Sequence, residues 1–107
     1  MLGHTAALAF QTVAEMQLGA ELRGWGKKRR VALTTFLDSH LTIFASDDVV
    51  EAWVTAMSAS QQAGRALGDG DAWIAACAMA NGARLLTHDV DFRGLPVPGL
   101  DVVCHAP

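Results

Sequence analysis

The strongest constraint on the fold is an alternation of short apolar runs with longer segments of helical periodicity. Strand-like runs, rich in β-branched or aliphatic side chains, occupy residues 6–10, 41–44, 84–87 and 100–104. Apolar residues recur at three- and four-residue steps through residues 49–57, which indicates a helix with one buried face. Strands that alternate with helices on short connections are typical of an α/β fold with a mostly parallel sheet.

Local start signals predict where the remaining helices begin. Thr12 and Glu15 have the spacing of a capping box, which predicts a helix over residues 13–22. Further helices are expected over residues 30–39 and within the segment 71–82, where Asn81 and Gly82 supply a stop. The helix of residues 49–57 is expected to be capped by the segment Ser46-Asp-Asp and to lose its pattern from about Ser58 onwards.

Length and composition exclude several classes of protein. A chain of 107 residues has the size of one domain, and 51% hydrophobic with 18% charged residues excludes disorder. No apolar run is long enough to span a membrane, and the first twenty residues lack the features of a signal peptide, so we expect a cytoplasmic protein. Cys77 and Cys104 are expected to be reduced and buried. A net charge of -3 argues against a basic nucleic-acid scaffold, although not against an enzyme that acts on nucleic acid.

Acidic side chains follow or precede the predicted elements where the carboxyl ends of parallel strands would meet. Glu15 comes soon after the first strand, Asp71 begins a helix, and Asp89 and Asp91 follow the strand 84–87. Two carboxylates 4 Å apart repel by about 4 kcal/mol at an effective dielectric constant near 20, whereas a cap contributes only about 1 kcal/mol. A hard divalent cation such as Mg²⁺ would offset this repulsion, and the chemistry it indicates is hydrolysis of a phosphodiester by metal-activated water.

Four segments together resemble one known family. QTVAEMQLGA (residues 11–20), GDGDAWIAA (68–76), LLTHDVDF (85–92) and the closing PGLDVV (98–103) resemble, in order and spacing, the PIN-domain ribonucleases of VapC-type toxins. The resemblance extends from Ala6 to Val103. It implies a single PIN-like domain over residues 1–107, with a three-layer α/β/α arrangement around a mostly parallel central sheet.

The resemblance also implies an activity and partners. It suggests an endoribonuclease that depends on Mg²⁺ or Mn²⁺, is commonly a homodimer, and is silenced by a VapB-like antitoxin. Glu15, Asp71 and Asp89 match the family's catalytic and metal-binding carboxylates, and Asp91 lies where it could share or replace the role of Asp89.

One departure from the family pattern concerns the start of the sequence. Such toxins ordinarily open with a strand that ends in Asp-x-Ser/Thr/Asn and supplies the first metal-binding carboxylate, and nothing before Ala6 provides it. Asp38-Ser39 falls at a predicted helix end and is no substitute. The first strand is therefore expected to be missing, through truncation, a misplaced start codon or gene decay. The alternative function is a catalytically inactive PIN remnant that binds antitoxin or RNA.

Several residues allow a structural interpretation beside the functional one. Lys27, Lys28, Arg29 and Arg30 form a basic stretch that is either a solvated face or an RNA-binding patch. Glu15 and Asp71 are helix-capping candidates as well as ligand candidates, and Asp residues after a strand are common in turns. His88, beside Asp89, is interpreted as a solvated turn residue or a substrate contact.

Overall fold

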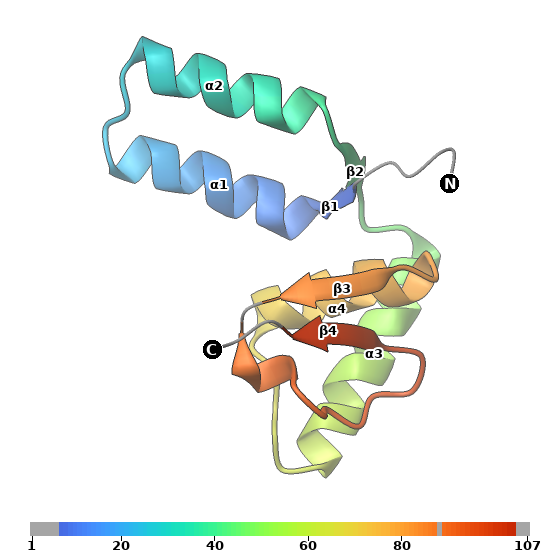
Figure 1. Ribbon diagram of the computed structural model, residues 1–107. Helices are drawn as coiled ribbons and strands as arrows, with labels where there is room; N and C mark the ends of the chain where they lie inside the picture. The colour runs from blue at the N-terminus through green and yellow to red at the C-terminus, as the bar shows by residue number, and fades with distance from the viewer. Residues whose placement is uncertain (1–6, 88, 105–107) are drawn as a thin grey trace. The chain divides into compact units, whose positions relative to one another are not determined.

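A computed structural model describes residues 7–87 and 89–104 of the chain. Contacts between Cα atoms divide the chain into two compact units, which we call the N-terminal unit (the described residues up to Phe44) and the C-terminal unit (those from Ala45 onwards). Each unit contains two hydrogen-bonded parallel strands together with helices (Figure 1). The alternation of strands and helices and the parallel pairing predicted from the sequence are confirmed. That the chain forms a single domain stays a prediction.

The N-terminal unit joins two short parallel strands through a pair of helices. Its elements are β1 (Ala7–Ala9), α1 (Phe10–Leu22), α2 (Lys27–Asp38) and β2 (Leu41–Ile43). The register pairs the residues of β1 in order with those of β2. Between the helices, Gly24 has a φ of 61°, a left-handed conformation that glycine adopts without steric cost and that ends α1.

Both helices of the N-terminal unit begin earlier than the sequence predicts. Helix α1 starts at Phe10 instead of Val13, because β1 passes directly into it through Ala9, which is the N-cap and has no side-chain cap hydrogen bond. Thr12 therefore lies inside the helix, and the capping box predicted for Thr12 and Glu15 is wrong. Helix α2 likewise starts at Lys27 instead of Arg30.

The N-terminal unit buries few side chains. Among its described residues only Ala9 and Ala20 are buried hydrophobics, and α2 contributes none. Large apolar side chains on its helices are exposed: Leu18, Leu22, Val31 and Phe36. Burial of small alanines contributes little hydrophobic free energy, because the stabilisation scales with the apolar area removed from water.

The C-terminal unit has a different order of elements, with both helices preceding both strands. The helices are α3 (Asp47–Gln62) and α4 (Asp69–Ala80), and the strands are β3 (Arg84–Thr87) and β4 (Asp101–Cys104). A short 3₁₀ helix, η1 (Val90–Phe92), follows β3. The strands pair in parallel from Arg84 opposite Asp101 to Thr87 opposite Cys104, and their arrows point the same way in Figure 1.

A contiguous hydrophobic core stabilises the C-terminal unit. Alanines on the buried face of α4 present small side chains to α3, which lets the two helices approach closely. Leu85 of β3 and Val102 of β4 pack against this core, whereas Leu86 on the other face of β3 is exposed. The buried members come from α3, α4 and the loops: Ala56, Leu67, Ala72, Ala75, Phe92, Leu95 and Val97.

Helix α3 begins as predicted and ends later. The Oγ of Ser46 accepts a hydrogen bond from the backbone N–H of Val49 at 3.3 Å, so Ser46 is the predicted cap. The helix continues to Gln62 although its apolar pattern fades from about Ser58 onwards. Ser60 explains the extension: it is fully buried, its hydroxyl donates to the carbonyl of Met57 at 3.2 Å, and it accepts from the N–H of Leu67 at 3.2 Å.

Two further predictions concern the cysteines and membrane-spanning helices. Cys77 and Cys104 are both free thiols, as predicted, but only Cys77 is buried and Cys104 is half-buried at the end of β4. Over the part of the chain that the structure describes, the helices are too short or too polar for any of them to cross a bilayer.

Candidate active site

The segment after β3 carries two of the predicted site residues in one tight turn. The N–H of Asp89 donates to the Thr87 hydroxyl at 3.0 Å, and the Oδ1 of Asp89 accepts from the N–H of Asp91 at 2.9 Å. This second bond closes an Asx turn and caps η1. Both aspartates are exposed. The turn therefore presents two carboxylates at the carboxyl end of a parallel strand, where α/β proteins bind ligands.

The same turn is fixed to the rest of the C-terminal unit on two sides. The ring of Phe92, only 3% exposed, belongs to the core and holds the base of the turn. At the end of β4, the thiol of Cys104 donates to the carbonyl of Asp89 at 3.7 Å and lies 3.9 Å from the guanidinium of Arg93. We call residues 89–93 the acidic turn.

Asp71 lies in the first turn of α4, in the same unit as the acidic turn. Gly68 is the N-cap of this helix, and Asp71 is its third residue. Its side chain is half-buried. A carboxylate in the first turn of a helix is favoured by the helix dipole by about 0.3–1 kcal/mol. The alanines that follow it pack α4 against α3 and so fix the position of its backbone.

Glu15 lies in the middle of α1, in the N-terminal unit, and its side chain is exposed. Because Thr12 is inside the helix and is not its cap, Glu15 has no capping-box role. Glu15 belongs to the helix that follows β1, as predicted, but it lies in the second turn instead of the first because α1 begins at Phe10. The structural alternative considered for this residue is thereby removed.

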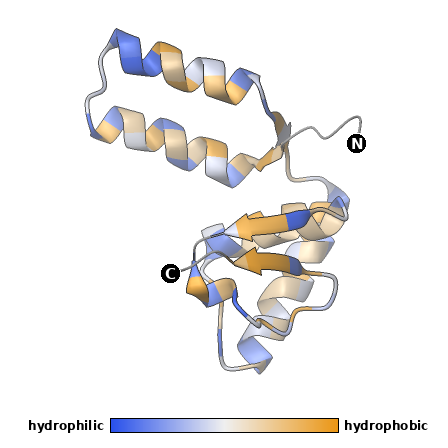
Figure 2. Cartoon of the chain, viewed as in Figure 1, coloured by the Kyte–Doolittle hydropathy of each residue, from blue (hydrophilic) through white to orange (hydrophobic). Residues whose placement is uncertain are grey.

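The basic stretch forms the first turn of α2 and is exposed. Arg30 donates to the carbonyl of Trp25 at 2.8 Å and forms an exposed ion pair with Glu21 at 3.3 Å. The guanidinium of Arg29 lies 5.8 Å from the centre of the Trp25 ring. Figure 2 shows this end of α2 as strongly hydrophilic, and the four residues are Lys27, Lys28, Arg29 and Arg30. Cations at a helix N-terminus are disfavoured by about 0.3–1 kcal/mol each, so helix stability does not account for their placement.

The structure thus brings together Asp89 and Asp91, and it places Asp71 in the same unit. Glu15 belongs to the other unit. Within residues 7–87 and 89–104 no three His, Cys, Asp or Glu side chains are grouped so that they could hold a metal ion. The chemistry of the candidates nevertheless fits a hard divalent cation, because all four contribute carboxylate oxygens. His88, a candidate substrate contact, lies outside the described residues.

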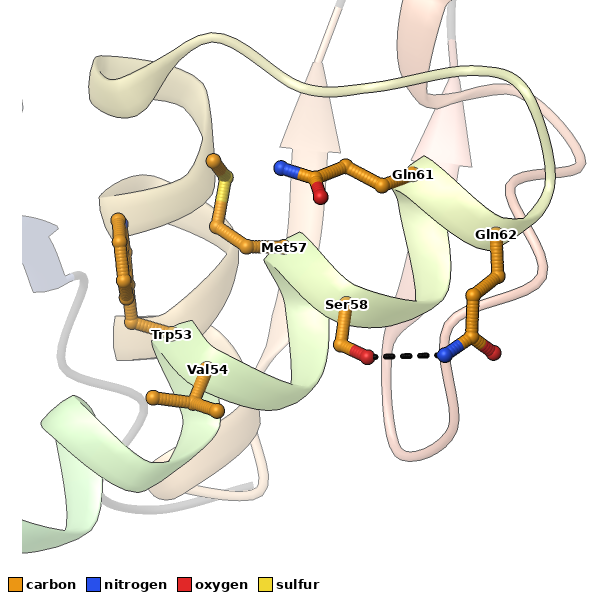
Figure 3. A pocket seen from close by; sticks show the side chains of 6 residues that line it. All are labelled: Trp53, Val54, Met57, Ser58, Gln61 and Gln62. Carbon is orange, nitrogen blue, oxygen red and sulfur yellow. Dashed lines mark hydrogen bonds between the residues drawn. The ribbon is translucent and has the colours of Figure 1, made fainter.

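A groove elsewhere in the C-terminal unit contains none of these carboxylates. It lies along α3, has a volume of about 500 Å³, and is lined by Trp53, Val54, Met57, Ser58, Gln61 and Gln62 (Figure 3). Gln62 donates to the hydroxyl of Ser58 at 3.2 Å across one edge of it. The ring of Trp53 stacks on that of Trp73 in α4, with 5.2 Å between centroids. The groove is lined by apolar groups, amides and one hydroxyl, and none of these could act in phosphodiester hydrolysis.

Sequence reasoning missed one residue next to the acidic turn. Arg65, in the loop between α3 and α4, donates through Nη2 to the carbonyls of Asp91 at 3.1 Å and Arg93 at 2.8 Å. No local pattern identifies such a residue, because its partners are more than twenty positions away. The only signal in the sequence is an isolated arginine after Gly64, outside the basic stretch.

Comparisons with known proteins decide the family. The PIN domain matches residues 4–97, which is most of the chain. The chain belongs to the PIN domain family. None of the curated proteins matches the sequence. The predicted resemblance and the PIN-like α/β fold are both confirmed.

Solved structures of toxin–antitoxin systems share this PIN fold. The structure of VapBC2 from Rickettsia felis, bound to a promoter DNA fragment, has a TM-score of 0.78 at 26% identity and covers 94% of this chain and 74% of that one. A toxin–antitoxin complex from Klebsiella pneumoniae has a TM-score of 0.65 at 30% identity, with coverage of 91% and 71%. VapBC-1 from nontypeable Haemophilus influenzae, at 22% identity, has the same fold with a TM-score of 0.80, covering 97% of this chain and 78% of that one.

The site and the comparisons agree on the general type of this PIN domain. It is related to the toxins of toxin–antitoxin systems, a family of nucleases. The acidic turn and the first turn of α4 carry three of the four carboxylates predicted from the sequence, Asp89, Asp91 and Asp71.

Proposed function

We propose that this PIN domain is the toxin of a type II toxin–antitoxin system and cleaves RNA as a Mg²⁺- or Mn²⁺-dependent endoribonuclease in the cytoplasm. The observation that carries the proposal is the acidic turn, which holds Asp89 and Asp91 at the carboxyl end of β3 in a chain of the PIN family. The carboxylate of Asp89 is held by a backbone hydrogen bond before any ligand arrives, and this lowers the free energy needed to organise a metal site.

The proposed roles divide among the carboxylates. Asp71 and Asp89, with Glu15 from the N-terminal unit, would supply oxygen ligands to the divalent ion, and Asp91 would share the role of Asp89. The chemistry that such an ion supplies is activation of an attacking water and stabilisation of charge on the phosphate. Since Oδ1 of Asp89 accepts from the N–H of Asp91, we expect Oδ2 to be the oxygen that binds the ion.

The basic stretch supports RNA as the substrate. A chain with a net charge of -3 needs local positive potential to attract a polyanion, and Lys27, Lys28, Arg29 and Arg30 provide it in one exposed helical turn. The N–H groups at the start of α2 add to that potential. We propose that this turn contacts the RNA backbone and leaves recognition of the sequence to other parts of the molecule.

An RNA cleavage assay with added Mn²⁺ tests the activity. Glu15→Gln, Asp71→Asn and Asp89→Asn should each lower the rate by at least about 100-fold, which corresponds to about 2.7 kcal/mol of transition-state stabilisation. Removal of divalent ions with a chelator should abolish cleavage by the parent chain. Asp69→Asn and Glu51→Gln are matched controls on exposed helical positions and should retain activity. If Glu15→Gln and Asp71→Asn both remain active, the proposal is wrong.

A VapB-like antitoxin is the proposed protein partner, and a homodimer is the proposed assembly. The Rickettsia and Klebsiella relatives were both solved as toxin–antitoxin complexes. The exposed apolar side chains of α1 and α2, such as Leu22 and Val31, are the type of surface that a partner covers. In the cleavage assay, addition of the cognate antitoxin should suppress the activity of the parent chain.

A second candidate is a PIN domain that binds antitoxin or RNA without cleaving it. One observation favours it: the described residues contain no group of three His, Cys, Asp or Glu side chains that could hold a metal ion. Cleavage with added Mn²⁺ should then be absent, while the chain still binds RNA or antitoxin. Cleavage that depends on Mn²⁺ would exclude this second candidate.

A further inference from the structure

Arg65 connects two segments that each lead to a proposed metal ligand. It lies in the loop between α3 and α4, four residues before the helix that carries Asp71 begins. Its guanidinium donates to the carbonyls of Asp91 and Arg93, in the turn that carries Asp89 and Asp91. The carbonyls flank Phe92, so the acidic turn is held by a buried ring at its base and by a guanidinium at its backbone.

The loop that carries Arg65 is itself fixed in place. The N–H of Arg65 donates to the carbonyl of Ser60 at 2.9 Å, and the N–H of Leu67 donates to the hydroxyl of Ser60 at 3.2 Å. Ser60 is fully buried and Leu67 is part of the core. The arginine therefore reaches the acidic turn from a rigid base.

Its two bonds are stronger and more specific than neutral ones. Hydrogen bonds from a charged guanidinium are roughly twice as strong as those between neutral groups, and a planar guanidinium fixes the direction of both bonds. Arg65 is exposed, so it is not there to neutralise a buried charge. Its contacts are backbone carbonyls, which means that it restrains the shape of the turn.

We propose that Arg65 is a positioning residue for the metal site: it holds the backbone of Asp91 and Arg93 and so keeps Asp89 and Asp91 in the conformation that presents their carboxylates to the ion. This inference rests on the proposed function. Positioning and electrostatics predict opposite changes in metal affinity when Arg65 is removed. A positive charge near the site repels a cation, so its removal alone would tighten metal binding, whereas loss of positioning weakens it.

The test combines metal affinity with a measurement on the turn itself. Mn²⁺ binding to the full chain is followed by calorimetric titration, and exchange of the Asp91 amide by NMR reports whether its bond to Asp89 stays closed. Arg65→Ala removes both contacts, Arg65→Lys keeps the charge but replaces the longer, planar guanidinium, and Arg84→Ala removes an exposed arginine that pairs with Asp101 on β4. We expect Arg65→Ala to weaken Mn²⁺ binding about tenfold and to speed exchange of the Asp91 amide about tenfold. Arg65→Lys should lie between the parent and Arg65→Ala, and Arg84→Ala should match the parent.

Each outcome decides between the explanations. Mn²⁺ affinity that rises or stays unchanged in Arg65→Ala overturns the positioning role, even if the variant is less stable or its amide exchange is faster. Unchanged exchange of the Asp91 amide overturns it as well. If the parent binds Mn²⁺ and Asp89→Asn abolishes that binding, the proposed function survives such a failure of the inference. If the parent binds no Mn²⁺, the proposed function fails and the inference fails with it.

Discussion

The two units are built from the same kinds of elements but differ in what they bury. The C-terminal unit encloses Leu67, Phe92, Leu95 and Val97 in a core against α3 and α4. The buried hydrophobics that the structure describes in the N-terminal unit are alanines, while Leu22 on α1 is 76% exposed. Parallel strands with helices are thus not sufficient for a core of large side chains. Hydrophobic stabilisation is therefore distributed unequally between the two units.

The candidate functional residues are also divided between the two units. The C-terminal unit carries the carboxylates on a rigid base, where hydrogen bonds and a buried aromatic ring fix the acidic turn. The N-terminal unit carries Glu15 and the basic stretch on exposed helix surfaces. We expect substitutions in the core and the acidic turn to change stability or metal binding, those in the basic stretch to change RNA binding, and Glu15→Gln to weaken metal binding.

Replacement of a buried phenylalanine should have the largest effect on stability. Phe92→Ala removes a ring that is 3% exposed and should lower the free energy of unfolding by about 3–5 kcal/mol. Phe36→Ala, on α2, removes a ring that is 42% exposed and should cost less than about 1 kcal/mol. Denaturant unfolding of both variants measures the difference. Similar losses in the two variants would show that the contrast between the units is wrong.

Removal of charge from the basic stretch should have a smaller effect, and on RNA binding instead of stability. Lys28→Ala with Arg29→Ala should weaken binding to single-stranded RNA about tenfold at low salt and reduce the salt dependence by about 0.7 for each lost phosphate contact. Arg84→Ala removes one positive charge from the C-terminal unit and should change binding less than about twofold. Titrations at several salt concentrations compare them. An equal effect per charge at both places would mean that net charge, and not this helical turn, determines binding.

The smallest expected effects concern the helix caps. Ser46→Ala removes the hydroxyl that accepts from Val49 and should destabilise α3 by about 1 kcal/mol. Thr12→Ala should change stability by no more than about 0.5 kcal/mol, because Thr12 lies inside α1 and is not its cap. Thermal unfolding of the two variants provides the comparison. A larger loss for Thr12→Ala than for Ser46→Ala would restore the capping box that the structure rejects.

Much of the fold could be predicted because its signals are local. The strand Arg84–Thr87 was predicted with its observed bounds, and the segment Ser46-Asp-Asp was predicted to cap α3 because it directly precedes an apolar periodic segment. The predicted starts of α1 and α2 were wrong because local capping signals do not determine where these two helices begin. Ala9 caps α1 by backbone geometry alone, and α2 begins at a cluster of cations that its own dipole disfavours.

The candidate site was predictable only in part. The place of Asp89 and Asp91 after a strand follows from chain order, since loops at strand ends are where ligands bind. Arg65 was not predictable, because its two acceptors are 26 and 28 residues away and the contact exists only once the C-terminal unit has folded. The extension of α3 was missed because Ser60, a polar residue in the fading apolar pattern, is buried and forms hydrogen bonds to Met57 and Leu67.

A crystal structure of the protein with Mn²⁺ tests the central claim most directly. Anomalous scattering from manganese locates the ion without reference to the expected ligands. Our account predicts one ion bound by carboxylate oxygens of Glu15, Asp71 and Asp89, which would join the contributions of the two units. A structure in which these three carboxylates lie too far apart to share an ion, or in which manganese binds elsewhere, would contradict it.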